Sequence, residues 1–257
     1  MCREVLKSIR ACPVAVRAQK SPESIAFIAA GKSFSYHDFH LEISACQVRL
    51  QSQGIRAGDR VLLSDLCPLD SCIMLWTLFR MGAVACPVNP LLPRKNLDAV
   101  MAVLEPQWVC HPAESAAACP VFQRLECFDE EGTERGSTFF FTAGRDAAVV
   151  MTSGSSGTPR LAIHSFENYM QGAIAANRNM PVVPGDRWLL SLPLFHVAGL
   201  AVLFRCALAG AAVVVPEADM SFEEALIQSC ATQVSLVPTQ LYRLLKSATS
   251  TEMLRSM

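Results

Sequence analysis

Residues 149–160 read VVMTSGSSGTPR, a short apolar run followed by a loop of hydroxyl residues and glycines that ends in a proline and a cation. Glycine lets a backbone approach a ligand closely and adopt positive φ, so the N–H groups and hydroxyls of such a loop can point at one anion. The G-x-x-x-x-G-K-[ST] spacing of a Walker A loop is absent. Composition alone leaves a flexible Ser/Gly linker open, but the strand before the loop and Pro159 and Arg160 after it favour a phosphate-binding loop. The predicted phosphate-binding residues are Thr152, Ser153, Gly154, Ser155, Ser156, Gly157, Thr158 and Arg160.

Strands and helices alternate on both sides of this loop. A predicted hairpin at residues 25–35 leads into a helix that begins at Ser35, with Asp38 three residues on. That helix has one apolar stripe, formed by Tyr36, Phe39, Ile43, Cys46 and Leu50. Further strands are predicted at 60–63, 84–87, 108–111, 147–151, 188–192 and 233–237, and helices at 69–81, 93–104, 166–178, 222–230 and from about 240.

This alternation predicts an α/β fold with mainly parallel sheets flanked by helices. The pattern weakens between Pro112 and Arg145, which contains an acidic run and two glycines. We therefore expect two α/β subdomains, one over residues 1–145 and one over residues 146–257 that carries the phosphate loop.

The composition narrows the class of protein. Of 257 residues, 51% are hydrophobic. The net charge of -1 gives the chain no overall positive charge that would attract nucleic acid or an anionic membrane. The eleven cysteines are odd in number and show no C-x-x-C pair, so we expect reduced, mostly buried thiols, no metal site and a cytoplasmic location. The apolar stretch 197–215 contains Arg205 and Gly210, which favours a helix and a buried strand over a membrane span.

Several segments together carry a resemblance to a known family. Residues 152–160 resemble the phosphate signature of the acyl-adenylate-forming superfamily, which normally has Thr at the position of Ser156 and Lys at that of Arg160. The segments GDRV (58–61), PVNP (87–90), SLPLFHVAG (191–199) and SLVPTQL (235–241) fall in the order that this superfamily uses. Within it, the combination is most similar to bacterial 2-succinylbenzoate-CoA ligases of menaquinone synthesis.

The resemblance implies ATP, Mg²⁺ and CoA as the ligands of an acid-thiol ligase that forms an acyl-adenylate from 2-succinylbenzoate. Donors and a cation around the phosphates would stabilise the charge that grows on the leaving pyrophosphate. Arg160 supplies the charge of the usual Lys with a different geometry, which leaves its phosphate contact open. A homo-oligomer is possible, because family members are often oligomers.

The predicted substrate pocket consists of His196, Arg205 and Thr239, of which the resemblance implies His196 and Thr239. His196 would line the wall between the acid and the nucleotide, although a lone histidine is more often a satisfied core residue. Arg205 lies in an apolar helix, where an unpaired cation is costly, so it needs a carboxylate, water or a polar cavity. Arg205 would either bind the second carboxylate of the acid or have a structural role, in an ion pair or with its charged end reaching the surface, and the sequence leaves both open.

The catalytic residues are unknown from this sequence. The family's magnesium-binding Glu and its catalytic Lys have no counterpart up to Met257, so we expect a truncated N-terminal portion that is inactive by itself. Two alternatives stay open: a ligase or adenylation domain for another acid, and a non-catalytic ligand-binding remnant.

Overall fold

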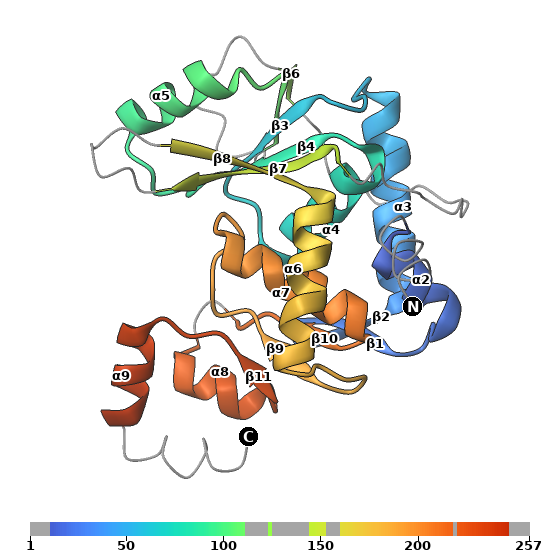
Figure 1. Ribbon diagram of the computed structural model, residues 1–257, viewed down its shortest axis with the longest axis vertical. Helices are drawn as coiled ribbons and strands as arrows, with labels where there is room; N and C mark the ends of the chain where they lie inside the picture. The colour runs from blue at the N-terminus through green and yellow to red at the C-terminus, as the bar shows by residue number, and fades with distance from the viewer. Residues whose placement is uncertain (1–10, 111–122, 125–143, 153–159, 218–219, 247–257) are drawn as a thin grey trace. The chain divides into compact units, whose positions relative to one another are not determined.

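The computed structural model describes residues 11–110, 123–124, 144–152, 160–217 and 220–246, which form an α/β fold with two sheets (Figure 1). Contacts divide the chain into two compact units. Unit 1 comprises residues 1–15 and 40–171, and unit 2 comprises residues 16–39 and 172–257. Each unit has its own sheet.

The sheet of unit 1 has six strands in the order β6-β5-β3-β4-β7-β8. Neighbouring strands are parallel except β7 and β8, which are antiparallel. The bounds are β3 (Arg60–Leu63), β4 (Val84–Pro87), β5 (Trp108–Cys110), β6 (Gln123–Arg124), β7 (Asp146–Thr152) and β8 (Arg160–Ser165). The strands connect through α4 (Pro68–Met81) and α5 (Arg94–Leu104). Val100 and Leu104 of α5 pack on the apolar face made by Leu62, Val84 and Val149.

The sheet of unit 2 has five strands in the order β11-β9-β10-β1-β2, all parallel except the hairpin of β1 and β2. Its strands are β1 (Ile25–Ala29), β2 (Lys32–Ser35), β9 (Arg187–Leu189), β10 (Ala212–Val214) and β11 (Gln233–Val234). The helices are α2 (Pro13–Lys20), α3 (Tyr36–Ser52), α6 (Phe166–Asn179), α7 (Val197–Ala209), α8 (Phe222–Gln228) and α9 (Pro238–Lys246), and the division into units falls inside α2, α3 and α6.

The start of α3 follows the predicted local pattern. Ser35 Oγ donates to Asp38 Oδ2 over 2.7 Å, and the Asp38 N–H donates back to Ser35 Oγ over 3.1 Å. These bonds satisfy donors that the first turn of a helix leaves unpaired. All five residues of the predicted apolar stripe are at most 3% exposed. The predicted helix face is therefore confirmed.

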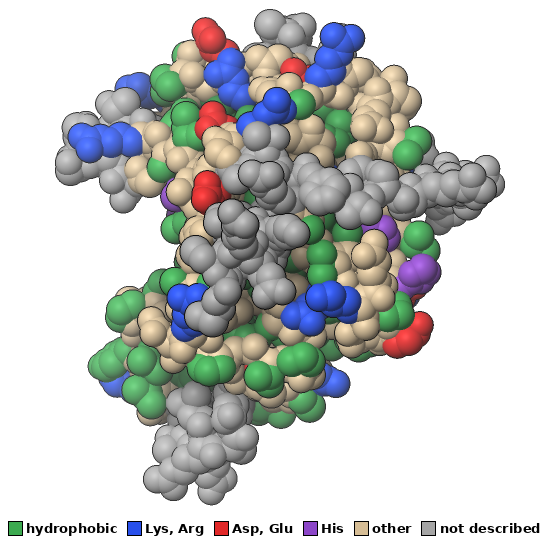
Figure 2. Space-filling model, turned by 45° about the vertical axis from the view of Figure 1, so that its right-hand side comes forward, with side chains coloured by type: hydrophobic (Ala, Val, Ile, Leu, Met, Phe, Trp, Pro, Cys, Tyr) green, Lys and Arg blue, Asp and Glu red, His purple; other side chains and the backbone are tan. Residues whose placement is uncertain are grey.

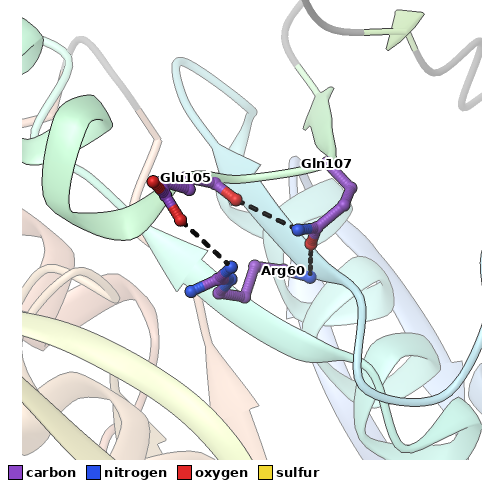
Figure 3. Close-up of polar contacts among 3 residues, drawn as sticks. All are labelled: Arg60, Glu105 and Gln107. Carbon is purple, nitrogen blue, oxygen red and sulfur yellow. Dashed lines mark hydrogen bonds and ion pairs between the residues drawn. The ribbon is translucent and has the colours of Figure 1, made fainter.

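A small polar cluster closes one end of the unit 1 sheet (Figure 3). The N–H of Arg60, at the start of β3, donates to Gln107 Oε1 over 2.7 Å, and Gln107 Nε2 donates to the Glu105 carbonyl over 3.1 Å. The guanidinium of Arg60 lies 4.0 Å from the Glu105 carboxylate. Both charged side chains are exposed, so this ion pair contributes little, and the backbone bond fixes the connection from α5 to β5.

Three sequence expectations differ from the structure. Strand β8 was not predicted: β7 pairs with a second, antiparallel strand before α6, and α6 itself begins at Phe166 as predicted. The predicted strands at 188–192 and 233–237 end earlier, at Leu189 and Val234. The compact units also differ from the predicted division at residue 145, because β7 pairs with β4 and β1 pairs with β10. Most of the predicted junction, residues 112–145, lies outside the described residues.

The cysteines and the apolar stretch 197–215 behave as predicted where the structure describes them. Eight described cysteines are free thiols, and all but Cys67 and Cys230 are buried. Gly210 has φ 79° and ends α7, and β10 follows. Within the described ranges, no helix combines the length and the hydropathy that a bilayer crossing requires. Charged side chains of both signs are scattered over the face in Figure 2, in keeping with the near-zero net charge.

Candidate functional site

Thr152 and Arg160, which flank the predicted phosphate loop, lie opposite each other at the loop end of the β7–β8 hairpin. Residues 147–150 of β7 are at most 6% exposed, which anchors the strand between β4 and β8. Thr152 pairs in register with Arg160, and Thr152 Oγ1 donates to the Arg160 carbonyl over 3.3 Å. Both residues are exposed. Ser153, Gly154, Ser155, Ser156, Gly157 and Thr158 lie outside the described residues.

The end of β7, after which the predicted loop begins, lies at the same end of the unit 1 sheet as a second predicted segment. Strands β4 and β7 are parallel, with Ala85 opposite Ala148, so both end at the same edge. The PVNP segment (87–90) follows β4 there, and Asn89 Oδ1 accepts from the Leu91 N–H over 2.9 Å, which makes a tight turn. In open α/β sheets, ligands bind beyond the carboxyl ends of the strands. The geometry therefore suits phosphate binding at the carboxyl ends of β4 and β7.

His196 and Thr239 follow neighbouring parallel strands of unit 2. Strand β9 leads to His196, and β11, which pairs with β9, leads to Thr239 in the first turn of α9. Ser191 Oγ donates to the Ser235 carbonyl over 2.5 Å and joins the two segments just beyond the strands. Both predicted pocket residues are exposed. The structure thus places His196 and Thr239 on segments that leave the same edge of the unit 2 sheet.

The segment before α7 lies so close to the helix that residue 199 has room only for glycine. His196 precedes α7 with extended backbone, and its N–H donates to the Pro193 carbonyl over 3.1 Å. This turn brings the chain so close to α7 that a Cβ on Gly199 would lie 2.3 Å from the Pro193 oxygen. The side chain of His196 makes no capping bond, and its ring lies 4.7 Å from that of Phe195, centroid to centroid. The imidazole is therefore not used to hold the helix.

Arg205 is buried, at 7% exposed, and is held by neutral groups. Its Nε donates to Asn177 Oδ1 over 2.8 Å, a terminal nitrogen donates to the Met180 carbonyl over 2.8 Å, and the guanidinium lies 4.3 Å from the Trp188 ring centroid. Burial lowers the pKa of Arg205 from its ordinary value. Among the described residues, no carboxylate lies within ion-pair distance of this guanidinium.

Arg205 does not adjoin His196. They are nine positions apart, which corresponds to about 13 Å of helix rise and about two and a half turns, so they lie on opposite sides of the helix axis. Asn177 and Trp188 were missed by sequence reasoning, since neither belongs to a recognisable motif. Asn177 Nδ2 also donates to the Arg205 carbonyl over 3.2 Å, so one amide holds both ends of this residue.

Comparisons with known proteins agree with this arrangement. The profile of the AMP-binding enzyme family matches residues 14–256. A 2-succinylbenzoate-CoA ligase of Salmonella typhimurium is 34% identical over 194 residues, covering 76% of this chain and 41% of the relative. The enzyme of the same name from Escherichia coli is 30% identical, covering 89% of this chain and 49% of the relative. The chain thus spans about half the length of these curated relatives.

Solved structures show the same fold. An Arg-to-Lys variant of Escherichia coli MenE with bound OSB-AMS superposes with a TM-score of 0.82 at 28% identity, over 91% of this chain and 51% of that one. The O-succinylbenzoate Coenzyme A Synthetase (MenE) from Bacillus subtilis in complex with AMP gives a TM-score of 0.85 at 22% identity, over 93% of this chain and 65% of that one. The family profile covers nearly all of the sequence, so this chain belongs to the AMP-binding enzyme family.

Proposed function

We propose that this chain is the first half of a 2-succinylbenzoate-CoA ligase of menaquinone biosynthesis. In the proposed reaction, a carboxylate oxygen of the acid attacks the α-phosphorus of ATP, the bond to pyrophosphate breaks, and an acyl-adenylate forms. The thiol of CoA then attacks the acyl carbon, loses its proton and displaces AMP. The shared name of the relatives from Salmonella typhimurium and Escherichia coli supports the choice of acid. The use of ATP and CoA supports the cytoplasmic location expected from the sequence.

The observation that carries the proposal is the frame of the phosphate loop. Thr152 and Arg160 lie in register at the loop end of the hairpin, and both are exposed. A guanidinium beside a loop rich in N–H and hydroxyl donors suits the β and γ phosphates, because it stabilises charge that develops on the leaving group. We assign this role to Arg160 and the predicted loop residues.

Mg²⁺ is expected to accompany ATP, and when bound it would neutralise charge on the phosphates. The described ranges contain no group of three His, Cys, Asp or Glu side chains suited to a metal. We therefore assign no residue of this chain to the ion and derive no step through it.

The acid is assigned to unit 2. His196 and Thr239 leave the same sheet edge, which supports their place in the pocket. Arg205 carries a buried charge with neutral partners, and a carboxylate of the acid would supply the missing counter-charge. The structural alternative is that Asn177, Met180 and Trp188 are its only partners.

The phosphate role is tested by pyrophosphate exchange in the enzyme with its second half present. Removing a charge-assisted hydrogen bond costs about 1.5 to 3 kcal/mol. Arg160→Ala should therefore slow exchange about 10- to 150-fold. Arg160→Lys keeps the charge and should recover most of the rate. Arg94→Ala is the matched control, since Arg94 is an exposed arginine of unit 1 paired with Asp98. Exchange by Arg160→Ala at the rate of the control would remove the loop from the mechanism.

A further inference from the structure

The carboxyl end of α7 is held by two side chains from the first part of the chain. Arg17 of α2 donates through Nε to the Ala207 carbonyl over 3.4 Å and through a terminal nitrogen to the Leu208 carbonyl. The hydroxyl of Tyr36, at the start of α3, donates to the Cys206 carbonyl over 3.1 Å. The last turn of a helix leaves such carbonyls without a partner inside the helix. We call Arg17 and Tyr36 the α7 clamp.

Both side chains of the α7 clamp are suited to a fixed contact. Tyr36 is 2% exposed, and burial raises the pKa of its hydroxyl, so the hydroxyl keeps the proton that it donates. The last turn of α7 has no basic residue of its own, so Arg17 supplies the positive charge that the carboxyl end of a helix favours. A Cβ on Gly210 would lie 3.2 Å from Arg17 Cζ, which is tighter than ordinary contact. The glycine after the helix therefore leaves room for the guanidinium.

The amino end of α7, which His196 precedes, has no comparable support. Among the described residues, no side chain forms a hydrogen bond with the first turn of α7. The side-chain hydrogen bonds that the structure shows for this helix lie in its carboxyl half, at the α7 clamp and at Arg205. Hydrogen bonds are directional, whereas burial of apolar surface is not. The polar contacts of the carboxyl half therefore define the position of α7 along its axis.

A helix moves as a rigid element, so a shift at one end is passed to the other. α7 has 13 residues, which corresponds to a length of about 20 Å. We propose that Arg17 and Tyr36 are positioning residues, whose bonds to the carboxyl end of α7 determine where its amino end presents His196 to the acid. The inference rests on the proposed place of His196 in the acid pocket. Misplacing a group at a reacting site by about 1 Å can slow a reaction about 100-fold.

The first test measures acid-dependent pyrophosphate exchange in the enzyme with its second half present. Arg17→Ala should lower kcat/KM for the acid at least tenfold and leave KM for ATP within twofold of the parent, because only the acid pocket is displaced. Arg17→Lys keeps the charge and should recover part of the loss. Arg187→Ala is the matched control, since Arg187 is an exposed arginine of unit 2 that donates to the Ser229 carbonyl after α8. The control should exchange at the parent rate.

The second test observes His196 itself, by NMR of the histidine side chains in the same enzyme without acid or nucleotide. The signal of His196, assigned by its loss in His196→Gln, should shift in Arg17→Ala and stay unchanged in Arg187→Ala. Tyr36→Phe removes a single oxygen and should shift the same signal, which keeps the test open if Arg17→Ala does not fold.

The two tests together separate this proposal from the proposed function. A shifted His196 signal together with the loss for the acid supports the α7 clamp as a positioning device. An unchanged signal overturns the proposal and leaves the proposed function as it stands, since the clamp would then only stabilise the end of the helix. A shifted signal with unchanged kinetics for the acid removes His196 from the acid pocket and overturns the proposal with it.

Discussion

Replacement of Gly199 by alanine tests how the segment carrying His196 is held against α7. Gly199 is the third residue of the helix and is buried. A Cβ there would lie 2.3 Å from the Pro193 oxygen, 2.7 Å from the Pro193 carbonyl carbon and 2.8 Å from the Leu192 oxygen. All three are backbone atoms, which cannot rotate aside as a side chain can. Ordinary contact begins at 3.4 Å, so the segment must move by about 1 Å.

Whether Gly199→Ala raises or lowers the free energy of unfolding shows which of two effects is larger, helix propensity or steric overlap. Helix propensity alone favours Ala over Gly by about 1 kcal/mol. Forcing a methyl group into a packed site costs typically about 1 to 3 kcal/mol, and here the obstacle is rigid. We expect Gly199→Ala to lower the free energy of unfolding by about 1 to 3 kcal/mol. The matched control is Gly172→Ala in α6, where a Cβ meets no atom within 4 Å. The control should raise the free energy by about 0.5 to 1 kcal/mol.

Urea unfolding followed by circular dichroism measures both variants. Hydrogen exchange of residues 190–200 shows whether the loss is local, and it should be faster in Gly199→Ala. If Gly199→Ala is as stable as the parent or more stable, the close approach of Pro193 to α7 is refuted.

The other predictions concern single side chains. Tyr36→Phe removes a buried hydroxyl that donates to two backbone carbonyls over 3.1 and 2.8 Å. The variant should lose about 1 to 3 kcal/mol of unfolding free energy, measured by urea titration. A loss below about 0.5 kcal/mol contradicts those bonds. Hydrogen bonds from Ser35 lower the pKa of Asp38 below its ordinary 3.8, so its stabilisation holds above that pH and fades as the pH falls through the lowered value. Asp38→Asn should therefore differ more from the parent at pH 7 than at pH 2, and a constant difference argues against the cap. In the complete enzyme, Arg205→Ala should raise KM for 2-succinylbenzoate far more than KM for ATP and should discriminate less against a monoacid analogue. Equal losses for diacid and monoacid would leave Arg205 a purely structural role.

Features that depend on a few neighbouring residues were predictable from the sequence. The Ser35–Asp38 cap and the end of α7 at Gly210 each lie within about one helical turn, and successive residues of the α3 stripe are only three or four positions apart. Periodicity and capping act between residues close in the chain, so a single sequence contains the whole of such a pattern. The order of motifs around the phosphate loop likewise needed no coordinates.

Strand β8 was missed for a local reason. The seven residues between Thr152 and Arg160 exceed the two-residue turns that identify a hairpin, and β8 is an edge strand without clear alternation of buried and exposed residues. That β8 pairs with β7 becomes clear only from the strand order of the folded sheet, in which β7 lies between β4 and β8.

Contacts between distant segments were decided by the tertiary structure. β1 pairs with β10 nearly two hundred residues later, which moves the N-terminal hairpin into unit 2. Arg205 was visible in the sequence as a cation in an apolar helix, but its neutral partners Asn177 and Trp188 come from α6 and β9. Helix periodicity predicts which face of a helix is buried, but it does not predict which residues pack against that face. That depends on how the sheet orders its strands, and the order is a property of the whole folded unit.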